Sequence, residues 1–592
     1  MKITHGPMLG HVTDSSIAIW ARTSSPGEFR IRYGLDPKRL DQISAPVRTE
    51  AAHDNTGWAK LTGLQPDTTY YYRPVTARDA GESGSFRTLP RSSDYVDAET
   101  NPKGLFNFRF QFGSCADQRP GTGAGPGLPA YETMLKSLPG KVHFSVMNGD
   151  WLYEDKRDFT VEQWLAQTGL TKENVPPIVQ RAPSIVGVWE NYKYFLERGA
   201  NLAAWHRLVP SYYTPDDHEI LNDIYGTAET GRRDRRTVFR DIGMQAWFDY
   251  LAGSQPTPYS QPLHIGEAKL SAGSDVLTDP TVDFTKLDRA QTLNLHVHWG
   301  GQFAGVDEGK YPTGSGDPNA GVYEVVEVLD AHRLRIRPAA TSNSSSIYSL
   351  GRLSFSNFRV GNVELFLLDT RSMRSLQDTS NPNKPGTSML GKRQKEWLMN
   401  AMKNSDADFF FIASSVNVTI PHVGNPAGTG QGGVVENKDD AWTAFLEERE
   451  ELIRFWDSLR KPVIIMTGDL HNSWAVKITD RVWEFASGPM NSQNHPLRSE
   501  GDRPVNGPYD SRGRKVDIRW STFVRNDVPA SLRKLPFYAV AQINNVFANP
   551  KAPGQTRWIA YPRPHLVISY YDGRTGDLLY AESVHAEHPV KH

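Results

Sequence analysis

One short stretch of the sequence concentrates groups that bind metals or move protons. It follows the aromatic pair at 212–213 and contains Asp216, Asp217, His218, Glu219 and, a little further on, Asp223. Carboxylates this close repel one another in a folded protein unless a cation or several hydrogen-bond donors lie among them. A solvated loop or a helix N-cap has a similar composition, so the stretch alone leaves that alternative open.

Similar polar groups recur where apolar runs with strand character end. In an open α/β sheet, ligands bind beyond the carboxyl ends of the strands. We therefore expect these strand ends to converge on one site. The runs and the groups that follow them are Phe108–Phe112 with Gly113-Ser114-Cys115-Ala116-Asp117, Val142–Met147 with Asn148-Gly149-Asp150-Trp151-Leu152-Tyr153-Glu154, Val363–Leu368 with Asp369-Thr370-Arg371, and Val463–Met466 with Thr467-Gly468-Asp469-Leu470-His471.

Each of these residues also has an ordinary structural explanation. Cys115 alone would be a buried thiol and Tyr153 a core aromatic residue. Asp150 and Asp469 would cap helices, and His471 would be a satisfied histidine. The joint pattern outweighs these alternatives, because Gly-Asp-x-x-Tyr, Asp-Asp-His-Glu and Gly-Asp-x-His on successive strands supply enough ligands for two metal ions.

The chain length predicts more than one domain, because 592 residues are more than one hydrophobic core usually supports. These domains must position the polar groups. Residues 1–88 show short alternating strands separated by turns, which predicts a small β-sandwich, and Leu61–Tyr70 resembles the strand-E corner of fibronectin type III domains. A polar linker at 89–104 follows. Buried strands alternate with helical patterns over 105–592, which predicts an α/β layered domain, with a β-rich insertion at about 255–350.

Composition narrows the classes of partner. With 66 basic and 67 acidic residues and a net charge of −1, the chain offers no bulk charge for binding nucleic acid. No segment has the ~20 apolar residues of a membrane span. The start at Met1 lacks the apolar region of a signal peptide, so we expect a cytoplasmic protein or a processed secreted or periplasmic form. Its one cysteine excludes an intrachain disulfide, and nothing indicates an oligomeric state.

Taken together, the motifs resemble those of the PhoD-like alkaline phosphatases and phosphodiesterases in the calcineurin-like metallophosphoesterase superfamily, which is related to the purple acid phosphatases. The resemblance implies a metallophosphoesterase-type β-sandwich flanked by helices, preceded by a fibronectin III-like domain. It further implies hydrolysis of small phosphate monoesters or diesters at a site with Fe³⁺ and Ca²⁺, Zn²⁺ or Mn²⁺ being the alternatives. The matching residues are Phe112–Cys115, Asn148–Glu154, Asp216–Glu219, Asp369–Arg371 and Gly468–His471.

The resemblance also implies roles for individual residues. Asp150 would bridge the metals, Cys115 and Tyr153 would bind iron, and Asp217 would bind the second metal. The remaining implied metal ligands are Asp216, Asp469 and His471. Thiolate, phenolate and imidazole favour a Lewis-acidic transition metal, whereas carboxylate oxygens suit Ca²⁺. The nucleophile would be a hydroxide activated by the metals.

Two residues are candidates for acting on the substrate itself. His218 would assist the leaving group by proton donation or by a hydrogen bond to the phosphate, with its ring oriented by Glu219. Arg371 would pair with phosphate oxygens, because a guanidinium forks onto them.

Three points stay open. The superfamily usually places a further histidine after the strand that here runs Phe409–Ser415, and His422 comes only some way beyond it, so oxygen ligands replace that histidine or the position is empty. Asp117, two residues after Cys115, has the spacing of an extra ligand. The competing functions are a phospholipase D-like phosphodiesterase and a non-catalytic metal-binding or adhesion protein on the same fold.

Overall fold

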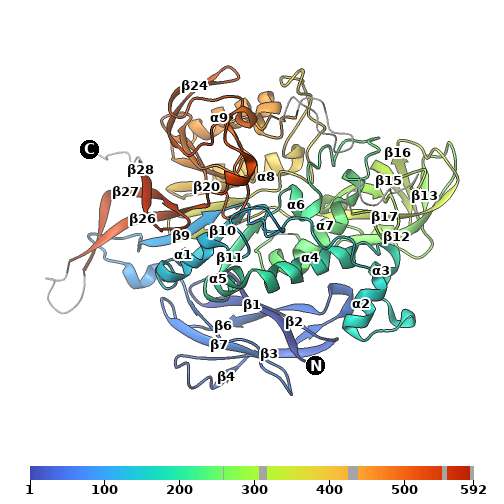
Figure 1. Ribbon diagram of the computed structural model, residues 1–592, viewed down its shortest axis with the longest axis horizontal. Coiled ribbons are helices and arrows are strands. Elements are labelled where there is room, and N and C mark those ends of the chain that lie inside the picture. The colour runs from blue at the N-terminus through green and yellow to red at the C-terminus, as the bar shows by residue number, and fades with distance from the viewer. Residues whose placement is uncertain (258, 306–315, 424–437, 550–556, 587–592) are drawn as a thin grey trace.

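Two sheets packed face to face form the centre of the molecule (Figure 1). The computed structural model describes residues 1–257, 259–305, 316–423, 438–549 and 557–586. The first sheet has the order β11 (Ser211–Thr214), β10 (Phe144–Asn148), β9 (Phe108–Gly113), β26 (Phe537–Asn549), β27 (Arg557–Asp572) and β28 (Leu578–His585). The second has the order β18 (Ser356–Val360), β19 (Val363–Leu367), β20 (Phe409–Ala413), β21 (Val463–Thr467), β23 (Val482–Ala486), β22 (Trp474–Lys477), β25 (Arg514–Ser521) and β24 (Gly507–Ser511).

The strands nearest the site are parallel and buried. In the first sheet β10 pairs in parallel with both β9 and β11, and in the second β20 pairs in parallel with β19 and β21. Every residue of β10, β20 and β21 is buried, as expected for continuously apolar strands that are covered on both faces. Aromatic rings join the two sheets, with Phe110 lying 5.2 Å from Phe411 and Phe144 lying 5.7 Å from Phe358 between ring centroids.

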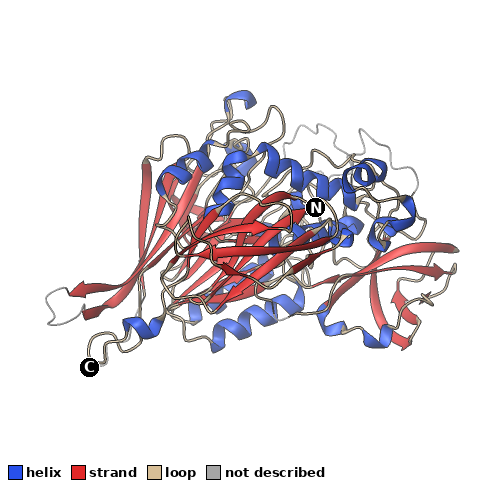
Figure 2. Cartoon of the chain, turned by 90° about the horizontal axis from the view of Figure 1, so that it is seen from below, coloured by secondary structure: helices blue, strands red, loops and turns tan. Residues whose placement is uncertain are grey.

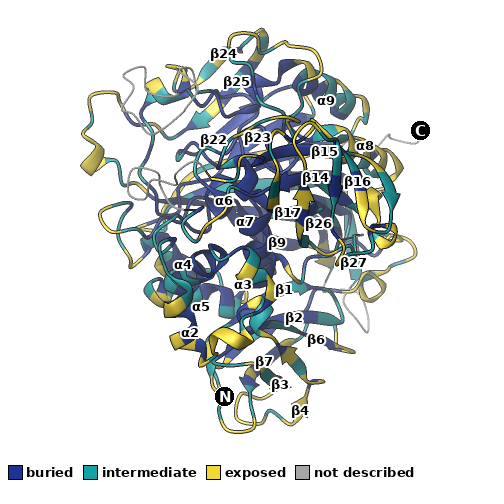
Figure 3. Cartoon of the chain, turned by 90° about the vertical axis from the view of Figure 1, so that its right-hand side faces the viewer, coloured by how far each residue is buried: buried dark blue, intermediate teal, exposed yellow. Residues whose placement is uncertain are grey.

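Helices cover the outer faces of this sandwich. Leu398 of α8 (Gly391–Asn404) and Leu452 of α9 (Leu446–Ser458) pack against the second sheet. The first sheet is covered by α1 (Pro129–Ser137), α4 (Ile185–Arg198), α5 (Ala200–Leu208) and α7 (Arg240–Trp247). The predicted sandwich flanked by helices is therefore confirmed. Figure 3 shows its buried strands in the interior and exposed residues at the loops of the rim.

The N-terminal region folds into two small sheets, at the bottom of Figure 1. One contains β1 (Ile3–Val12), β2 (Ser16–Thr23) and β6 (Thr56–Thr62), and the other contains β3 (Gly27–Gly34), β4 (Gln42–Ile43), β5 (Val47–Thr49), β7 (Thr69–Val75) and β8 (Gly84–Arg87). Leu9, Ile19 and Phe29 are fully buried between them. We call this region the N-terminal sandwich.

A closed six-stranded barrel projects on the side away from the C-terminal strands β27 and β28 (Figure 2). It is filled by its own side chains, among them Leu277, Leu295 and Tyr348, all fully buried. Its strands are β12 (His264–Leu270), β13 (Val276–Thr278), β16 (Arg333–Arg337), β15 (Gly321–Asp330), β14 (Thr292–Val297) and β17 (Ser344–Arg352). Among the described residues, no helix has the length and apolarity that crossing a membrane requires.

Candidate metal centre

The predicted strand ends meet at one edge of the sandwich. Cys115, Asp150 and Asp216 follow the carboxyl ends of β9, β10 and β11, three adjacent parallel strands. Asp469 and His471 follow β21 in the facing sheet. Ligand atoms of these residues fall into overlapping groups, each with all its atoms within 4.8 Å of one another. Among the groups are Cys115–Asp150–His471, Asp150–Asp217–His218 and Asp216–Asp217–Asp469.

An unusual backbone conformation marks these turns. Positive φ is uncommon outside glycine, although Asp and His tolerate it better than most residues, and such conformations collect at functional sites. Four residues in the turns after β9, β10 and β21 adopt this conformation, and their side chains belong to the groups of ligand atoms described above. The residues are Cys115 (φ 62°), Asp150 (φ 56°), Asp469 (φ 66°) and His471 (φ 53°).

The first group contains the thiol of Cys115 and the imidazole of His471, and the phenol of Tyr153 lies beside it. The Tyr153 hydroxyl lies 3.0 Å from Asp150 Oδ2 and 3.0 Å from His471 Nε2. His471 Nδ1 lies 2.7 Å from the carbonyl of Gln493, so this nitrogen carries the proton and Nε2 turns its lone pair to the group. Burial lowers the pKa of His471 to about 4, which keeps the ring neutral, the form that binds a metal.

The other two groups of ligand atoms consist mainly of carboxylates. Asp150 Oδ1, Asp216 Oδ2 and Asp217 Oδ1 are buried and have no hydrogen-bond partner among the described residues. Burial raises the pKa of Asp150 and of Asp216 well above the usual carboxyl range, because the charged forms lack solvation. Bare oxygens of this kind are costly unless a cation binds them. The residues present therefore fit a metal centre.

The structure corrects the partner expected for His218. Glu219 does not orient the ring, because its carboxylate accepts hydrogen bonds from the backbone N–H groups of Asp150, Trp151 and Asp216. Glu154 takes that place, with Oε2 at 2.6 Å from His218 Nδ1. Burial alone would lower the pKa of His218, but Glu154 and the nearby aspartates raise it to about 10.

Arg371 is fully buried and already engaged by two carboxylates. Its Nε lies 2.5 Å from Asp216 Oδ1, and its Nη1 lies 2.9 Å from both oxygens of Asp440. Only Nη2 has no hydrogen-bond partner in the described part of the chain, and it lies 3.9 Å from Asp217 Oδ1. Two carboxylates thus fix the guanidinium of Arg371 in place.

Two other acidic residues lie outside the ligand groups found among the described residues. Asp117 instead makes a bidentate ion pair with Arg119, which corrects its expected role as an extra ligand. Asp369 accepts hydrogen bonds from the backbone N–H groups of Arg371 and Ser372, so it stabilises the turn after β19.

The sequence motifs assign no role to three further residues that lie at the site, of which Asp223 and His422 had been noted and Asp440 had not. His422 Nδ1 lies 2.7 Å from Asp469 Oδ2, and His422, Asp440 and Asp469 form a further group of ligand atoms. Asp223 joins Asp217 and Asp440 in another group. The sequence carries one indirect signal for His422: no histidine directly follows β20, where the superfamily usually has one. Asp440 gave none, because it is remote from any apolar strand.

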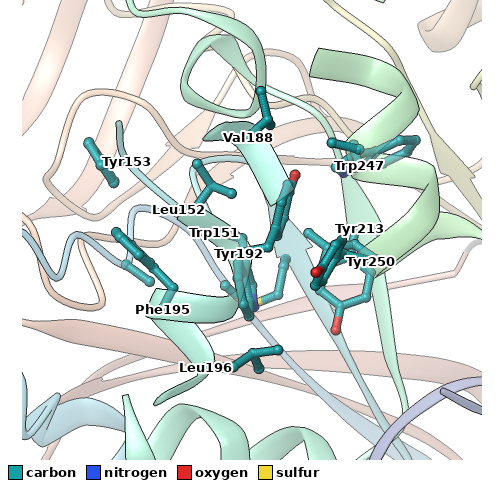
Figure 4. Packing of buried hydrophobic residues seen from close by; sticks show 14 of the residues in the cluster. Trp151, Leu152, Tyr153, Val188, Tyr192, Phe195, Leu196, Tyr213, Trp247 and Tyr250 are labelled. Atoms are coloured by element: carbon teal, nitrogen blue, oxygen red, sulfur yellow. The ribbon is translucent and has the colours of Figure 1, made fainter. Parts of the chain in front are cut away.

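Aromatic packing holds the loop after β10 in place, and Figure 4 shows Trp151, Leu152 and Tyr153 beside side chains of α4. Trp151 Nε1 donates to His206 Nε2 at 2.9 Å, and the Trp151 and Tyr192 rings stack at 5.8 Å. The side-chain amide of Asn191 donates to the carbonyl of Tyr153 at 2.9 Å. These contacts hold the backbone of the loop that carries Tyr153, while its phenol reaches Asp150 and His471.

Comparisons with known proteins agree with this architecture. The model of the PhoD-like phosphatase family matches residues 110–270 and 336–521, and that of the N-terminal domain of PhoD-like phosphatases matches residues 1–90. Between these two ranges, the described part of the chain contributes β13, β14, β15 and the start of β16 to the barrel.

Individual proteins are similar at low identity. Alkaline phosphatase D of Bacillus subtilis is 23% identical over an aligned length of 504 residues. The match covers 80% of this chain and 65%, just under two thirds, of that protein. The solved structure of PhoD shares the fold, with a TM-score of 0.55 and 16% identity over 100% of this chain and 93% of that one. A purple acid phosphatase from yellow lupin seeds aligns with a TM-score of 0.48 and 8% identity, over 98% of this chain and 74% of that one.

Proposed function

The chain belongs to the PhoD-like phosphatase family, and we propose that it hydrolyses phosphate esters at the metal centre around Asp150 and Asp217. One observation carries the proposal. Three buried carboxylate oxygens, of Asp150, Asp216 and Asp217, have no partner among the described residues and lie beside a thiol, a phenol and a neutral imidazole. Cations bound at this edge would satisfy all of them together.

The donor types suggest how two metals would be shared. Cys115, Tyr153 and His471 would hold a transition metal, iron(III) by family resemblance, together with Asp150. Oxygen donors suited to calcium would hold the second, with Asp150 bridging, and these are Asp216, Asp217 and Asp469. Zn²⁺ and Mn²⁺ remain the alternatives. Such a pair of ions polarises a phosphate ester and lowers the pKa of a water molecule.

Residues of the chain would then position the ester and move its proton. His218 would donate a proton from Nε2 to the oxygen of the leaving group, since Glu154 engages Nδ1 and keeps the ring charged. Arg371 would offer its remaining nitrogen to a phosphate oxygen, while its ion pairs with Asp216 and Asp440 fix the guanidinium in place.

Hydrolysis assays before and after chelation test the proposal. Purified protein is given para-nitrophenyl phosphate as the monoester and bis-para-nitrophenyl phosphate as the diester. We expect release of nitrophenol that stops on removal of the metals and returns when iron and calcium are restored. Lack of turnover of both esters by metal-loaded protein would contradict the proposal and favour a metal-binding protein without catalysis. The ratio of the two rates determines whether the enzyme prefers monoesters or diesters.

A further inference from the structure

Three exposed arginines lie on the outer face of the N-terminal sandwich. They are Arg30 and Arg32 of β3 and Arg73 of β7, and Arg32 lies directly opposite Arg73 on the two antiparallel strands. Opposite residues point to the same face of a sheet, where two like charges repel each other. Arg30 Nη1 donates to the carbonyl of Ser44 at 3.1 Å, and Arg73 Nε donates to that of Gly81 at 2.6 Å. Both side chains are therefore oriented by neutral groups, and this face keeps a concentration of positive charge.

A hollow of about 740 Å³ opens on the same face. Its lining includes three exposed arginines, Arg30, Arg32 and Arg78. Two carboxylates also line it. Asp79 accepts the backbone N–H of Ile3 at 2.8 Å, and Glu28 lies opposite Arg48 in the pairing of β3 with β5. Because guanidinium groups fork onto phosphate oxygens, the hollow suits the phosphate group of a ligand.

Exposed apolar side chains lie beside the arginines. Ile43 of β4 is opposite Arg32 in the pairing with β3 and is 47% exposed. Leu35, directly after β3, is 54% exposed. At a membrane surface, aliphatic side chains enter the boundary of the acyl chains while arginines bind anionic headgroups. A soluble phosphate ester offers no apolar phase, so this combination favours a lipid surface as the partner.

We propose that this face docks the protein on a surface of anionic phospholipid. We call it the arginine face, and it consists of Arg30, Arg32, Ile43, Arg73 and Arg78. Its strands lie at the bottom of Figures 1 and 3, whereas α6 (Asp217–Ile220), which carries residues of the metal centre, lies nearer the middle of both views. The arginine face is thus separate from the metal centre, and the inference does not depend on the proposed function.

Vesicle sedimentation tests this inference on the full chain. The protein is mixed at low salt with vesicles of phosphatidylcholine alone or of equal parts phosphatidylcholine and phosphatidylglycerol. We expect binding to the mixed vesicles only, and less binding as salt screens the arginines. Arg30→Gln/Arg32→Gln should weaken binding about fivefold for each arginine removed. Arg333→Gln/Arg335→Gln is the matched control and should bind as wild type does, because these arginines have the same spacing on β16 but already pair with carboxylates.

A second variant tests the apolar contact without changing the charge. Ile43→Ser should weaken binding to the mixed vesicles at every salt concentration, because it removes the side chain that enters the lipid. The thermal transition of each variant shows whether it folds. Arg32→Gln should leave that transition unchanged or raise it, since it removes one of two opposed charges.

Three results would overturn the inference. The first is wild type that does not bind the mixed vesicles, and the second is binding that the arginine-face variants leave unchanged or that the control pair loses equally. The third is displacement from the vesicles by millimolar glycerol phosphate but not by sodium chloride of equal ionic strength, because the hollow would then take soluble phosphate esters. All variants should hydrolyse para-nitrophenyl phosphate as wild type does, so failure of vesicle binding leaves the proposed function standing.

Discussion

The imidazole of His218 and the carboxylate of Glu154 form a close, part-buried pair, with Nδ1 and Oε2 2.6 Å apart. The second carboxylate oxygen of Glu154 accepts the backbone N–H of Asn222 at 2.6 Å, which fixes its orientation. The pair leaves His218 Nε2 directed away from Glu154 and stabilises the charged ring. It connects the loop after β10 with the acidic stretch after β11.

Replacing Glu154 should alter the pH dependence of hydrolysis. Glu154 helps to hold the pKa of His218 at about 10, so the ring stays protonated through neutral pH. In Glu154→Gln this pKa falls, and the alkaline limb of the pH–rate profile should move to lower pH while the metals stay bound. His218→Ala should keep the metals and slow hydrolysis by ~10²–10⁴-fold, as loss of a general acid does. An unchanged alkaline limb in Glu154→Gln would contradict the assigned pair.

Removing the central carboxylate should abolish two properties at once. Asp150 belongs both to the group with Cys115 and His471 and to the group with Asp217. We therefore expect Asp150→Asn to lose turnover and bound metal together, as elemental analysis and ester assays on one sample would show. Asp117→Asn is the matched control, since Asp117 pairs with Arg119 outside the ligand groups. Retained activity in Asp150→Asn would refute the bridging role.

Much of this site follows from sequence because its motifs are local. A turn after a parallel strand places Asp150 or Asp469 at the sheet edge whatever the rest of the chain does. Residues delivered by long-range contacts are different. Glu154 lies 64 positions before His218 in the sequence. No spacing rule identifies it as the partner of His218 in place of Glu219, the next residue along the chain. His422 and Asp440 enter through irregular chain, where neither periodicity nor an apolar strand marks their approach.

The fold shows the same division. Within the β-rich insertion expected at about 255–350, β15 and β16 form a hairpin, because alternation and a tight turn determine a hairpin locally. Closure of the barrel depends on β17 pairing with both β12 and β14, which sequence alternation does not specify.

A buried aspartate should anchor the N-terminal sandwich to the helices. Asp54 is fully buried, pairs with Arg22 at 2.9 Å, and accepts hydrogen bonds from Trp164 and Tyr250. Removing one partner of a buried ion pair costs about 3–5 kcal/mol. We expect Asp54→Asn to lower the free energy of unfolding by that order in denaturant titrations. Asp14→Asn breaks a partly exposed pair with Arg91 and should cost no more than about 1 kcal/mol.

Stability should fall as the pH drops below 6.5. Burial lowers the pKa of His206 from 6.5 to about 3. Between pH 3 and pH 6.5 this histidine is therefore neutral in the folded state but protonated in the unfolded state. Each such group reduces the free energy of unfolding by about 1.4 kcal/mol per pH unit in that window. His206→Gln keeps an acceptor for the Trp151 indole. Denaturation between pH 4 and 6.5 should show a shallower slope for this variant, whereas an identical slope would contradict the assignment.

Elemental analysis with a visible spectrum of the same sample tests the metal centre most directly. The central claim is that Cys115 and Tyr153 bind a transition metal beside a calcium held by carboxylates. It predicts near-stoichiometric iron with calcium, and a charge-transfer band that Tyr153→Phe removes or shifts. Protein that holds no metal, even after reconstitution with iron and calcium, would contradict the claim.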